Sequence, residues 1–426
     1  MSAEAHAPSY YAATANAYDP FPVLDAPVDV DVCVIGGGFT GLSAALHLRE
    51  RGFSVAVLEA NRVGWGASGR NGGQLHTGQR RDQQWLEKEI GEDGACKMWA
   101  LGREAVETFK RLIAEHDIAC DYRDGLLHGV HKKAWLDDEK SHVEHLQKRY
   151  GYDAIRYLDA DEINAALGTD SFYGGHRDAE AGHVHPLNYA IGLAEAARRA
   201  GAQIFEGTRA TGLDRSGGLT VTTERAPVKA KSVVLAGNGY LRGLDRTADA
   251  VVMPINNFVI GTEPMSAERV AATIPGREAA SDSRFVVNYW RITNDNRMLF
   301  GGGENYSPNF PRDISGFVRP YMLKLYPGLA DLKIDYAWGG TLAVTVKRMP
   351  FLKRLDRHVY YAGGYSGQGV GTATFAGKLL AEAIAGEMER FDVFGKVRLP
   401  KFRGGDLLRY PTLVLAMTWF ALRDRL

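Results

Sequence analysis

Three glycines near the N-terminus have the spacing of a phosphate-binding turn. Gly36, Gly38 and Gly41 form G-x-G-x-x-G within VCVIGGGFTGLSAALHL, between an apolar run and residues at helical spacing. In this pattern the first glycine permits a tight turn, the second lets backbone approach a pyrophosphate, and the third lets helix pack on strand. The helix start offers N–H groups and a positive dipole to phosphate. Because Glu59 ends the next apolar run, where a carboxylate can accept hydrogen bonds from ribose hydroxyls, we predict a dinucleotide site.

A second glycine-rich segment follows at residues 64–75 and indicates which dinucleotide binds. Its sequence, GWGASGRNGGQL, is too polar and too rich in glycine for a core. It carries Ser68, Arg70 and Asn71 among its glycines. Such a loop can pass close to a flat ring system and meet a second phosphate with backbone N–H groups and a guanidinium. This loop favours FAD over NAD.

The elements around these motifs predict a mixed α/β protein. Strand, turn, helix and strand follow one another across residues 28–60, and helical spacing recurs at 82–117 and 186–200. Strand-like runs separated by turns between about 250 and 305 indicate an antiparallel sheet. Further elements are expected as strands at 203–205, 219–222, 232–236 and 359–362 and as a helix from about 374 to 387.

Size and charge narrow the class of protein. The chain has 426 residues, more than one hydrophobic core usually supports, so two domains are expected. Lysine plus arginine and aspartate plus glutamate both number 51, which is not the basic surplus of a nucleic-acid-binding protein. No run approaches the roughly 18 apolar residues of a membrane span. The chain start lacks the pattern of a signal peptide.

The cysteines and histidines give no disulfide or metal pattern. The three cysteines are odd in number and lack C-x-x-C spacing. His176, His183 and His185 cluster in HRDAEAGHVHP without the spacing of a metal site. We therefore expect no metal and a reducing, cytoplasmic location.

Several segments resemble the FAD-dependent D-amino-acid oxidase superfamily, which includes sarcosine and glycine oxidases. These are IGGGFTGLSAALHL, LEANRVGWGASGRNGGQL and YYAGGYSGQGV, and similarity continues through KSVVLAGNGYL, NYWRITNDNRMLFGGGENY and IDYAWGG. The resemblance covers nearly the whole chain. It implies an α/β fold with a Rossmann-type FAD-binding domain and a substrate domain built on a large antiparallel β-sheet.

The resemblance also implies how the chain is divided. The FAD-binding domain is expected to be discontinuous, over residues 28–95, 175–245 and 335–395. The substrate domain is expected over 96–174 and 246–334. An N-terminal segment, 1–27, would wrap the fold, and 396–426 would form a C-terminal tail helix.

The family motifs carry a set of expected FAD contacts onto this sequence. The pyrophosphate, ribose, adenine and flavin contacts are implied at Gly36, Gly38, Phe39, Thr40, Gly41, Glu59, Ala60, Arg62, Ser68, Arg70, Asn71, Gly72, Gly73, Gln74, Ala210, Ala236, Gly237, Gly364, Ser366, Gly367, Gln368, Gly369 and Val370. Some relatives tether the flavin through a cysteine in the C-terminal region. This chain has no cysteine after Cys120, so noncovalent FAD is expected.

One departure from the family pattern bears on the substrate. Relatives that bind an α-amino-acid carboxylate carry W-x-G-x-R, whose arginine clamps the carboxylate. The corresponding run here is Trp338-Gly339-Gly340-Thr341-Leu342. With Leu342 at the arginine position, a small α-amino acid lacks its principal anchor. The sequence favours an amine whose reacting carbon bears no carboxylate, such as γ-glutamylputrescine.

The expected strand RFVVNYWRIT supplies candidate substrate contacts. Alternate side chains share a face of a strand, so Tyr289 and Arg291 would point one way and Trp290 the other. If the first face looks over the flavin, Arg291 could pair with a distant substrate carboxylate and Tyr289 could shape the pocket. An arginine on a solvated sheet edge beside core aromatics is the alternative.

The reaction implied is hydride transfer from the carbon bearing a neutral amine to flavin N5. Hydrolysis of the imine would give an aldehyde and ammonia, as in γ-glutamylputrescine to γ-glutamyl-γ-aminobutyraldehyde. No dedicated catalytic base is identified. The electron acceptor would be O2 or another acceptor, and Lys347 and Arg348 are candidates for a positive charge that assists oxygen reduction. The alternatives are a sarcosine- or glycine-type oxidase, an amine dehydrogenase using a protein or quinone acceptor, and a non-catalytic nucleotide-binding protein.

Overall fold

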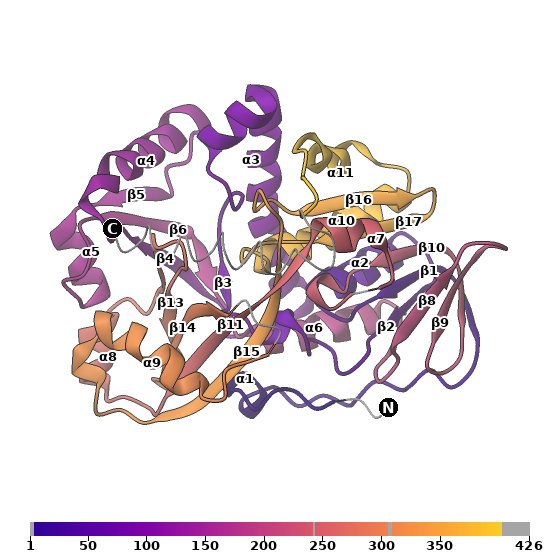
Figure 1. The fold of residues 1–426 in the computed structure, drawn as a ribbon, viewed down its shortest axis with the longest axis horizontal. Helices are drawn as coiled ribbons and strands as arrows, with labels where there is room; N and C mark the ends of the chain where they lie inside the picture. Colours follow the sequence, from indigo (N-terminus) through magenta and orange to yellow (C-terminus); the bar gives the residue numbers. More distant parts are fainter. Residues whose placement is uncertain (1–3, 242, 306–308, 403–426) are drawn as a thin grey trace.

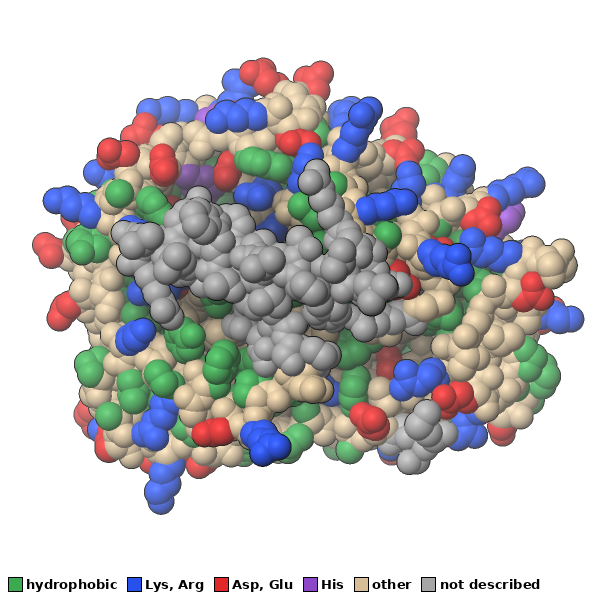
Figure 2. Space-filling model, viewed as in Figure 1, with side chains coloured by type: hydrophobic (Ala, Val, Ile, Leu, Met, Phe, Trp, Pro, Cys, Tyr) green, Lys and Arg blue, Asp and Glu red, His purple; other side chains and the backbone are tan. Residues whose placement is uncertain are grey.

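Two β-sheets organise the molecule, one on each side of the view in Figure 1. The computed structural model describes residues 4–241, 243–305 and 309–402. On the face drawn in Figure 2, acidic and basic side chains are interspersed among the described residues. In the described part of the chain, no helix is long and apolar enough to cross a membrane.

The first sheet consists of β1 (Val28–Ile35), β2 (Val55–Leu58), β7 (Gln203–Phe205), β8 (Ala210–Asp214), β9 (Leu219–Thr223), β10 (Val228–Leu235), β16 (Phe351–Asp356) and β17 (Val359–Gly363). Its order is β16-β17-β10-β1-β2-β7, with β9 also on β10 and β8 on β9. The strands from β17 to β7 are parallel. Such strands are buried on both faces, which explains the continuous apolar runs in the sequence.

Helices α2 (Phe39–Glu50), α6 (Pro186–Arg199) and α10 (Val370–Ile384) pack on strands of this sheet, and α3 (Gln83–His116) packs on α6 and α10. Helix α2 packs against α6 and α10, and α10 packs against α3. Val32, Val34 and Val57 of the sheet join them in the largest apolar core. This packing fixes where the N-termini of α2 and α10 point.

The second sheet consists of β3 (Gln74–Leu75), β4 (Arg123–Gly129), β5 (Ile155–Leu158), β6 (Gly175–His183), β11 (Met253–Thr262), β12 (Ala279–Asp282), β13 (Tyr289–Ile292), β14 (Met298–Asn305) and β15 (Ile334–Val344). Its order is β15-β11-β14-β13-β12-β4-β6-β3, with β5 on β6. Every pairing is antiparallel except β12 with β4. The sheet is therefore mixed, not purely antiparallel as expected.

Shorter elements complete the fold. Helix α4 (Leu136–Tyr150) packs on β5 and β6, and α9 (Ile314–Leu325) packs on β11, β14 and β15. The remaining helices are bounded as α1 (Tyr10–Ala13), α4 (Leu136–Tyr150), α5 (Ala160–Leu167), α7 (Arg246–Val251), α8 (Ala267–Thr273), α9 (Ile314–Leu325) and α11 (Glu389–Val393). Short 3-10 turns are η1 (Ala67–Gly69), η2 (Lys133–Trp135), η3 (Asn238–Tyr240), η4 (Pro327–Leu329) and η5 (Phe394–Lys396).

The expected fold class is confirmed. Strands β6 and β15 fall in the ranges expected for the FAD-binding domain, yet they belong to the second sheet. The backbone of β6 pairs with β4 and that of β15 pairs with β11, so hydrogen bonding, and not position in the chain, places both strands in the second sheet. Residues 403–426 of the expected tail helix lie outside the described residues.

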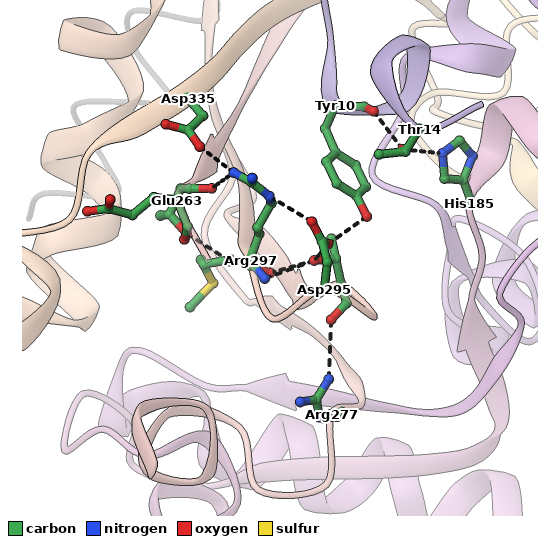
Figure 3. Close-up of polar contacts among 11 residues, drawn as sticks. Tyr10, Thr14, His185, Glu263, Arg277, Asp295, Arg297 and Asp335 are labelled. Atoms are coloured by element: carbon green, nitrogen blue, oxygen red, sulfur yellow. Dashed lines mark hydrogen bonds and ion pairs between the residues drawn. The ribbon is translucent and has the colours of Figure 1, made fainter. Parts of the chain in front are cut away.

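The N-terminal segment runs along the edge of both halves of the molecule (Figure 1). Tyr10 Oη donates to Asp295 Oδ1 at 2.8 Å, in the turn between β13 and β14 (Figure 3). Asn188 N donates to His185 Nδ1 at 3.1 Å, so Nε2 carries the proton toward Thr14 Oγ1, 3.0 Å away. The segment therefore bonds to an element of each half.

Candidate active site

A cavity of about 1690 Å³ is lined by residues from both sheets. Phe39 and Thr40, at the start of α2, and Val370, at the start of α10, all line it. The cavity thus receives two helix N-termini, each of which favours negative charge. A dinucleotide, with phosphates at one position and a ring that gains negative charge on reduction at the other, matches this arrangement.

The glycine turn at the start of α2 is closed too tightly for side chains. Gly36 has φ +116°, and a Cβ on Gly41 would lie 1.9 Å from Gly36 O. A Cβ on Gly38 would lie 2.8 Å from Ser68 Oγ, which accepts a hydrogen bond from Phe39 N at 3.1 Å. The second glycine-rich loop is therefore bonded directly to the first.

Glu59 is the acidic group next to this turn. Its carboxylate accepts from Gly37 N and from Asn61 N, both at 2.8 Å. Burial raises the pKa of Glu59, and the two backbone donors oppose that rise. Glu59 lines the cavity, so its oxygens are placed to accept from hydroxyl groups such as those of a ribose.

Polar side chains of the second loop hold the loop itself. Arg70 stacks 4.2 Å from the centroid of the Trp65 ring and donates from Nε to Trp65 O at 2.7 Å. Asn71 Oδ1 accepts from Gly73 N at 2.7 Å, and Gln74 Nε2 donates to Ala280 O at 2.7 Å. The loop is thereby fixed with one side facing the cavity.

The C-terminal glycine loop closes the same cavity. Tyr365 and Thr40 share a hydrogen bond of 2.6 Å between their hydroxyls, which links this loop to α2. Gln368 Nε2 donates to Gly78 O at 3.2 Å. Ser366 has φ +54° and accepts from Thr345 N through its Oγ at 3.2 Å. The loop before α10 is therefore anchored on both sides.

Most of the expected FAD contacts line this cavity. They are Gly36, Gly38, Phe39, Thr40, Glu59, Ala60, Ser68, Arg70, Asn71, Gly72, Gln74, Ala210, Ala236, Gly237, Ser366, Gly367, Gln368, Gly369 and Val370. They come from the first sheet, the start of α2, both glycine loops and the start of α10.

Four expected contacts do not line the cavity. Gly41 packs on Gly36 O, and a Cβ on Gly73 would lie 2.2 Å from Val184 O. Gly364 has φ +70° and allows the turn before Tyr365. Arg62 forms an ion pair of 2.8 Å with Glu206, a buried carboxylate that sequence reasoning missed. The three glycines allow the close turns next to the cavity, and Arg62 holds Glu206 outside its lining.

The three substrate candidates are not brought together at the cavity. Tyr289 lines it, and its hydroxyl donates to Asn257 Oδ1. Trp290 is 1% exposed in the apolar core, where its Nε1 donates to Tyr326 Oη at 2.9 Å. Arg291 is 3% exposed and donates from Nε to Gly72 O at 3.2 Å. Arg291 shares a face with Tyr289 but lies beneath the loop at residues 64–75, so it gives no support to a substrate carboxylate contact.

A group of histidines lines the cavity where the second sheet meets α4. His128 on β4 and His176 on β6 stack with ring centroids 5.1 Å apart. Glu139 of α4 bonds to His176 Nδ1. His76 and His142 also line this region, which we name the histidine chamber (His76, His128, Glu139, His142 and His176). No local motif predicts it, because its members come from separate elements.

Electrostatics in the histidine chamber keep most imidazoles neutral. Burial lowers the pKa of His76 to about 4 and that of His128 to about 3. Burial alone would lower the pKa of His176, but the Glu139 carboxylate outweighs it and the net shift is upward. No group of three or more histidine, cysteine or acidic residues that could hold a metal was found among the described residues.

The fold and the cavity together define a flavin-dependent oxidoreductase. The family described as DAO, FAD dependent oxidoreductase, matches residues 31–383. The chain belongs to this family and uses FAD as its cofactor. Its enzymes act on amine or amino-acid substrates, and FAD supplies the two-electron oxidation when bound.

Sequence similarity to known proteins extends over almost the full chain. The sequence is 42% identical to gamma-glutamylputrescine oxidoreductase of Escherichia coli (strain K12), over 99% of each chain. It is 38% identical to the probable oxidoreductase OrdL of Rhizobium meliloti (strain 1021), over 98% of this chain and 97% of that one. Glycine oxidase from Bacillus cereus has the same fold, with a TM-score of 0.70 at 19% identity, over 87% of this chain and 98% of that one.

Proposed function

We propose that this protein oxidises the terminal primary amine of a γ-glutamylated diamine, with γ-glutamylputrescine as the substrate and γ-glutamyl-γ-aminobutyraldehyde and ammonia as products. The observation that carries this is Leu342. It lines the cavity on β15 at the position where the family pattern has its carboxylate-binding arginine. A leucine there offers apolar contact to a methylene chain and no partner to an α-carboxylate. The similarity to gamma-glutamylputrescine oxidoreductase supports the same substrate.

The chain's own residues would position the amine and exclude water. Leu342, Tyr289 and Val259 line the part of the cavity formed by the second sheet. Apolar walls favour the neutral amine over the ammonium, because burial disfavours charge, and the neutral form is the one that can be oxidised. FAD bound without a covalent link completes the proposal, since Cys33 and Cys120 are buried and no cysteine follows. The three free cysteines also support a reducing, cytoplasmic location.

Anaerobic titration of the purified holoenzyme tests the substrate. We expect γ-glutamylputrescine to bleach the visible band of oxidised flavin, and sarcosine and glycine to leave it unchanged. Bleaching by sarcosine or glycine alone would assign a sarcosine- or glycine-type oxidase and reject the proposal. Re-oxidation of the bleached sample in air, with peroxide measured, distinguishes O2 from a protein or quinone acceptor.

Leu342→Arg tests the structural argument. The new guanidinium would stand at the cavity wall and bind an α-carboxylate bidentately. We expect glycine or sarcosine oxidation to appear and kcat/KM for γ-glutamylputrescine to fall about tenfold or more, since a buried unpaired charge opposes the methylene chain. Leu213→Arg, at a partly buried site outside the cavity lining, is the control for a buried charge.

A further inference from the structure

Two arginines line the cavity from separate elements. Arg81 lies just before α3, and Arg348 lies in the turn between β15 and β16. Arg81 Nε donates to Lys347 O at 3.0 Å, and its guanidinium lies 5.0 Å from the centroid of the Trp85 ring. The Arg348 guanidinium lies 4.6 Å from the centroid of the Phe285 ring. Aromatic rings and one carbonyl thus hold both head groups at the wall.

Neither arginine is ion-paired within the described part of the chain. The charged residues next to them in the sequence do have partners. Lys347 pairs with Glu89, and Asp82 caps α3 by accepting a hydrogen bond from Trp85 N at 2.7 Å. Because Arg81 Nε donates to the carbonyl of Lys347, the residue before Arg348, the two arginines lie on adjoining segments of the cavity wall. Burial and then repulsion from Arg348 lower the pKa of Arg81, and Asp82 opposes this shift. Two positive charges in the lining of one cavity, neither with an ion-pair partner among the described residues, favour an anionic group on the ligand.

The backbone at Arg348 is held in a strained conformation. Its φ is +60°, in the left-handed region that costs a non-glycine residue about 1 kcal/mol. Arg348 N donates to Thr345 O at 3.0 Å, and Thr345 N donates to Ser366 Oγ at 3.2 Å. The turn is therefore fixed to the loop that precedes α10. Backbone strain of this kind is enriched at ligand-binding sites, where it aims a side chain.

We propose that Arg81 and Arg348 bind a carboxylate at the far, non-reacting end of the amine substrate. This rests on the proposed function. Leu342 offers no charged group to the reacting end of the substrate. Arg348, six residues later in the sequence (Leu342 to Arg348), also lines the cavity and does carry a charge. The site would therefore take an ω-amine that carries a remote carboxylate, and would discriminate against amines that lack it. This pair takes the role that the sequence had suggested for Arg291, which is buried beneath the loop at residues 64–75.

Binding of a non-oxidisable probe tests the carboxylate site directly. γ-Glutamylmethylamide carries the glutamyl carboxylate and no terminal amine, and its Kd for the holoenzyme can be measured by calorimetry. We expect Arg81→Gln and Arg348→Asn each to raise that Kd about tenfold or more. Asparagine tolerates the left-handed conformation, so it removes the charge without adding strain. Lys347→Gln removes a charge from the same turn and should leave Kd within about twofold.

Steady-state kinetics separate carboxylate recognition from general damage. N-acetylputrescine offers the same amine without a carboxylate. In Arg348→Asn we expect KM for γ-glutamylputrescine to rise about tenfold with kcat nearly unchanged, and KM for N-acetylputrescine to stay within about twofold.

Unchanged probe affinity in both variants, or equal increases in KM for both substrates, would overturn the carboxylate site. A wild-type enzyme that binds the probe through Arg348 yet leaves γ-glutamylputrescine unoxidised would support the carboxylate site and reject the proposed reaction.

Discussion

The Arg291 guanidinium lies beneath the Gly72–Gly73 turn, and no carboxylate pairs with it among the described residues. Its Nη2 donates to Tyr11 Oη at 3.4 Å. Burial, and then the charge of Arg291, lower the pKa of His183 and of His185 to about 3, so both neighbouring imidazoles are neutral. A buried cation without an anion is costly unless it serves a ligand or the backbone. Here it supports the backbone of the loop at residues 64–75, which we expect to contact the flavin.

Arg291→Met is expected to weaken FAD binding. It removes the charged donor to Gly72 O, and a hydrogen bond of that kind contributes about 1.5–3 kcal/mol, so Kd for FAD should rise about tenfold or more. Titration of the apoprotein with FAD, followed by flavin fluorescence, measures it, and the flavin absorption maximum should also shift. Arg277→Met, whose guanidinium donates to Thr293 O, should bind FAD normally. Equal losses in the two variants would contradict a specific role for Arg291.

At the scale of elements, the N-terminal segment joins the two halves of the molecule. Tyr10 is 5% exposed and reaches the β13–β14 turn, while Thr14 reaches the cap of α6 (Figure 3). Asp295, the acceptor of the Tyr10 hydroxyl, also pairs with Arg297 at 2.7 Å. Burial and then Asp295 raise the pKa of Tyr10 to about 12, so the hydroxyl remains a donor. The segment therefore stabilises the strand that carries Tyr289 and Arg291.

Tyr10→Phe is expected to lower the free energy of unfolding by about 1 kcal/mol, because the Asp295 carboxylate loses a buried donor. Thermal unfolding of the holoenzyme measures it. Tyr173→Phe removes a hydroxyl from a side chain that is 50% exposed and should leave the melting temperature unchanged. A melting temperature equal to wild type in Tyr10→Phe would show that the segment is not anchored through this contact.

For the whole molecule, buried neutral histidines make stability depend on pH. In the folded state the pKa of His128 is about 3 and that of His76 about 4, against 6.5 when unfolded. Below pH 6.5 the unfolded chain therefore binds more protons than the folded one. As the pH is lowered, the free energy of unfolding decreases by up to about 1.4 kcal/mol per pH unit for each such group. The groups facing His128 are Glu139, His176, His76 and His142. The raised pKa of His176 acts in the opposite direction, because its pair with Glu139 is lost only as pH rises.

Denaturant unfolding at three pH values about one unit apart, 7.5, 6.5 and 5.5, checks this expectation. Wild type should lose stability below pH 6.5, and His128→Gln should lose less because it removes one titrating group. His358→Gln, at an exposed histidine, is the matched control and should follow wild type. A slope in His128→Gln as steep as that of wild type would remove His128 from the explanation.

The sequence by itself determined the cofactor and the class of fold. The glycine turn, Glu59 and the loop at 64–75 are short contiguous motifs, and each constraint on them is local: a positive φ, a close approach or a helix start. For this reason most of the expected FAD contacts do line one cavity. The sequence alone likewise shows that position 342 is a leucine and not an arginine.

Tertiary structure alone decided which charged residues reach the cavity. Alternation along a strand predicts that Tyr289 and Arg291 share a face, but it cannot say that Gly72 covers Arg291. Arg81 reaches the turn that carries Arg348 only in the folded chain, where its Nε donates to Lys347 O and the same turn is bonded to the loop before α10. Such contacts join residues far apart in the sequence through strand register and helix packing, so no local pattern of residues encodes them.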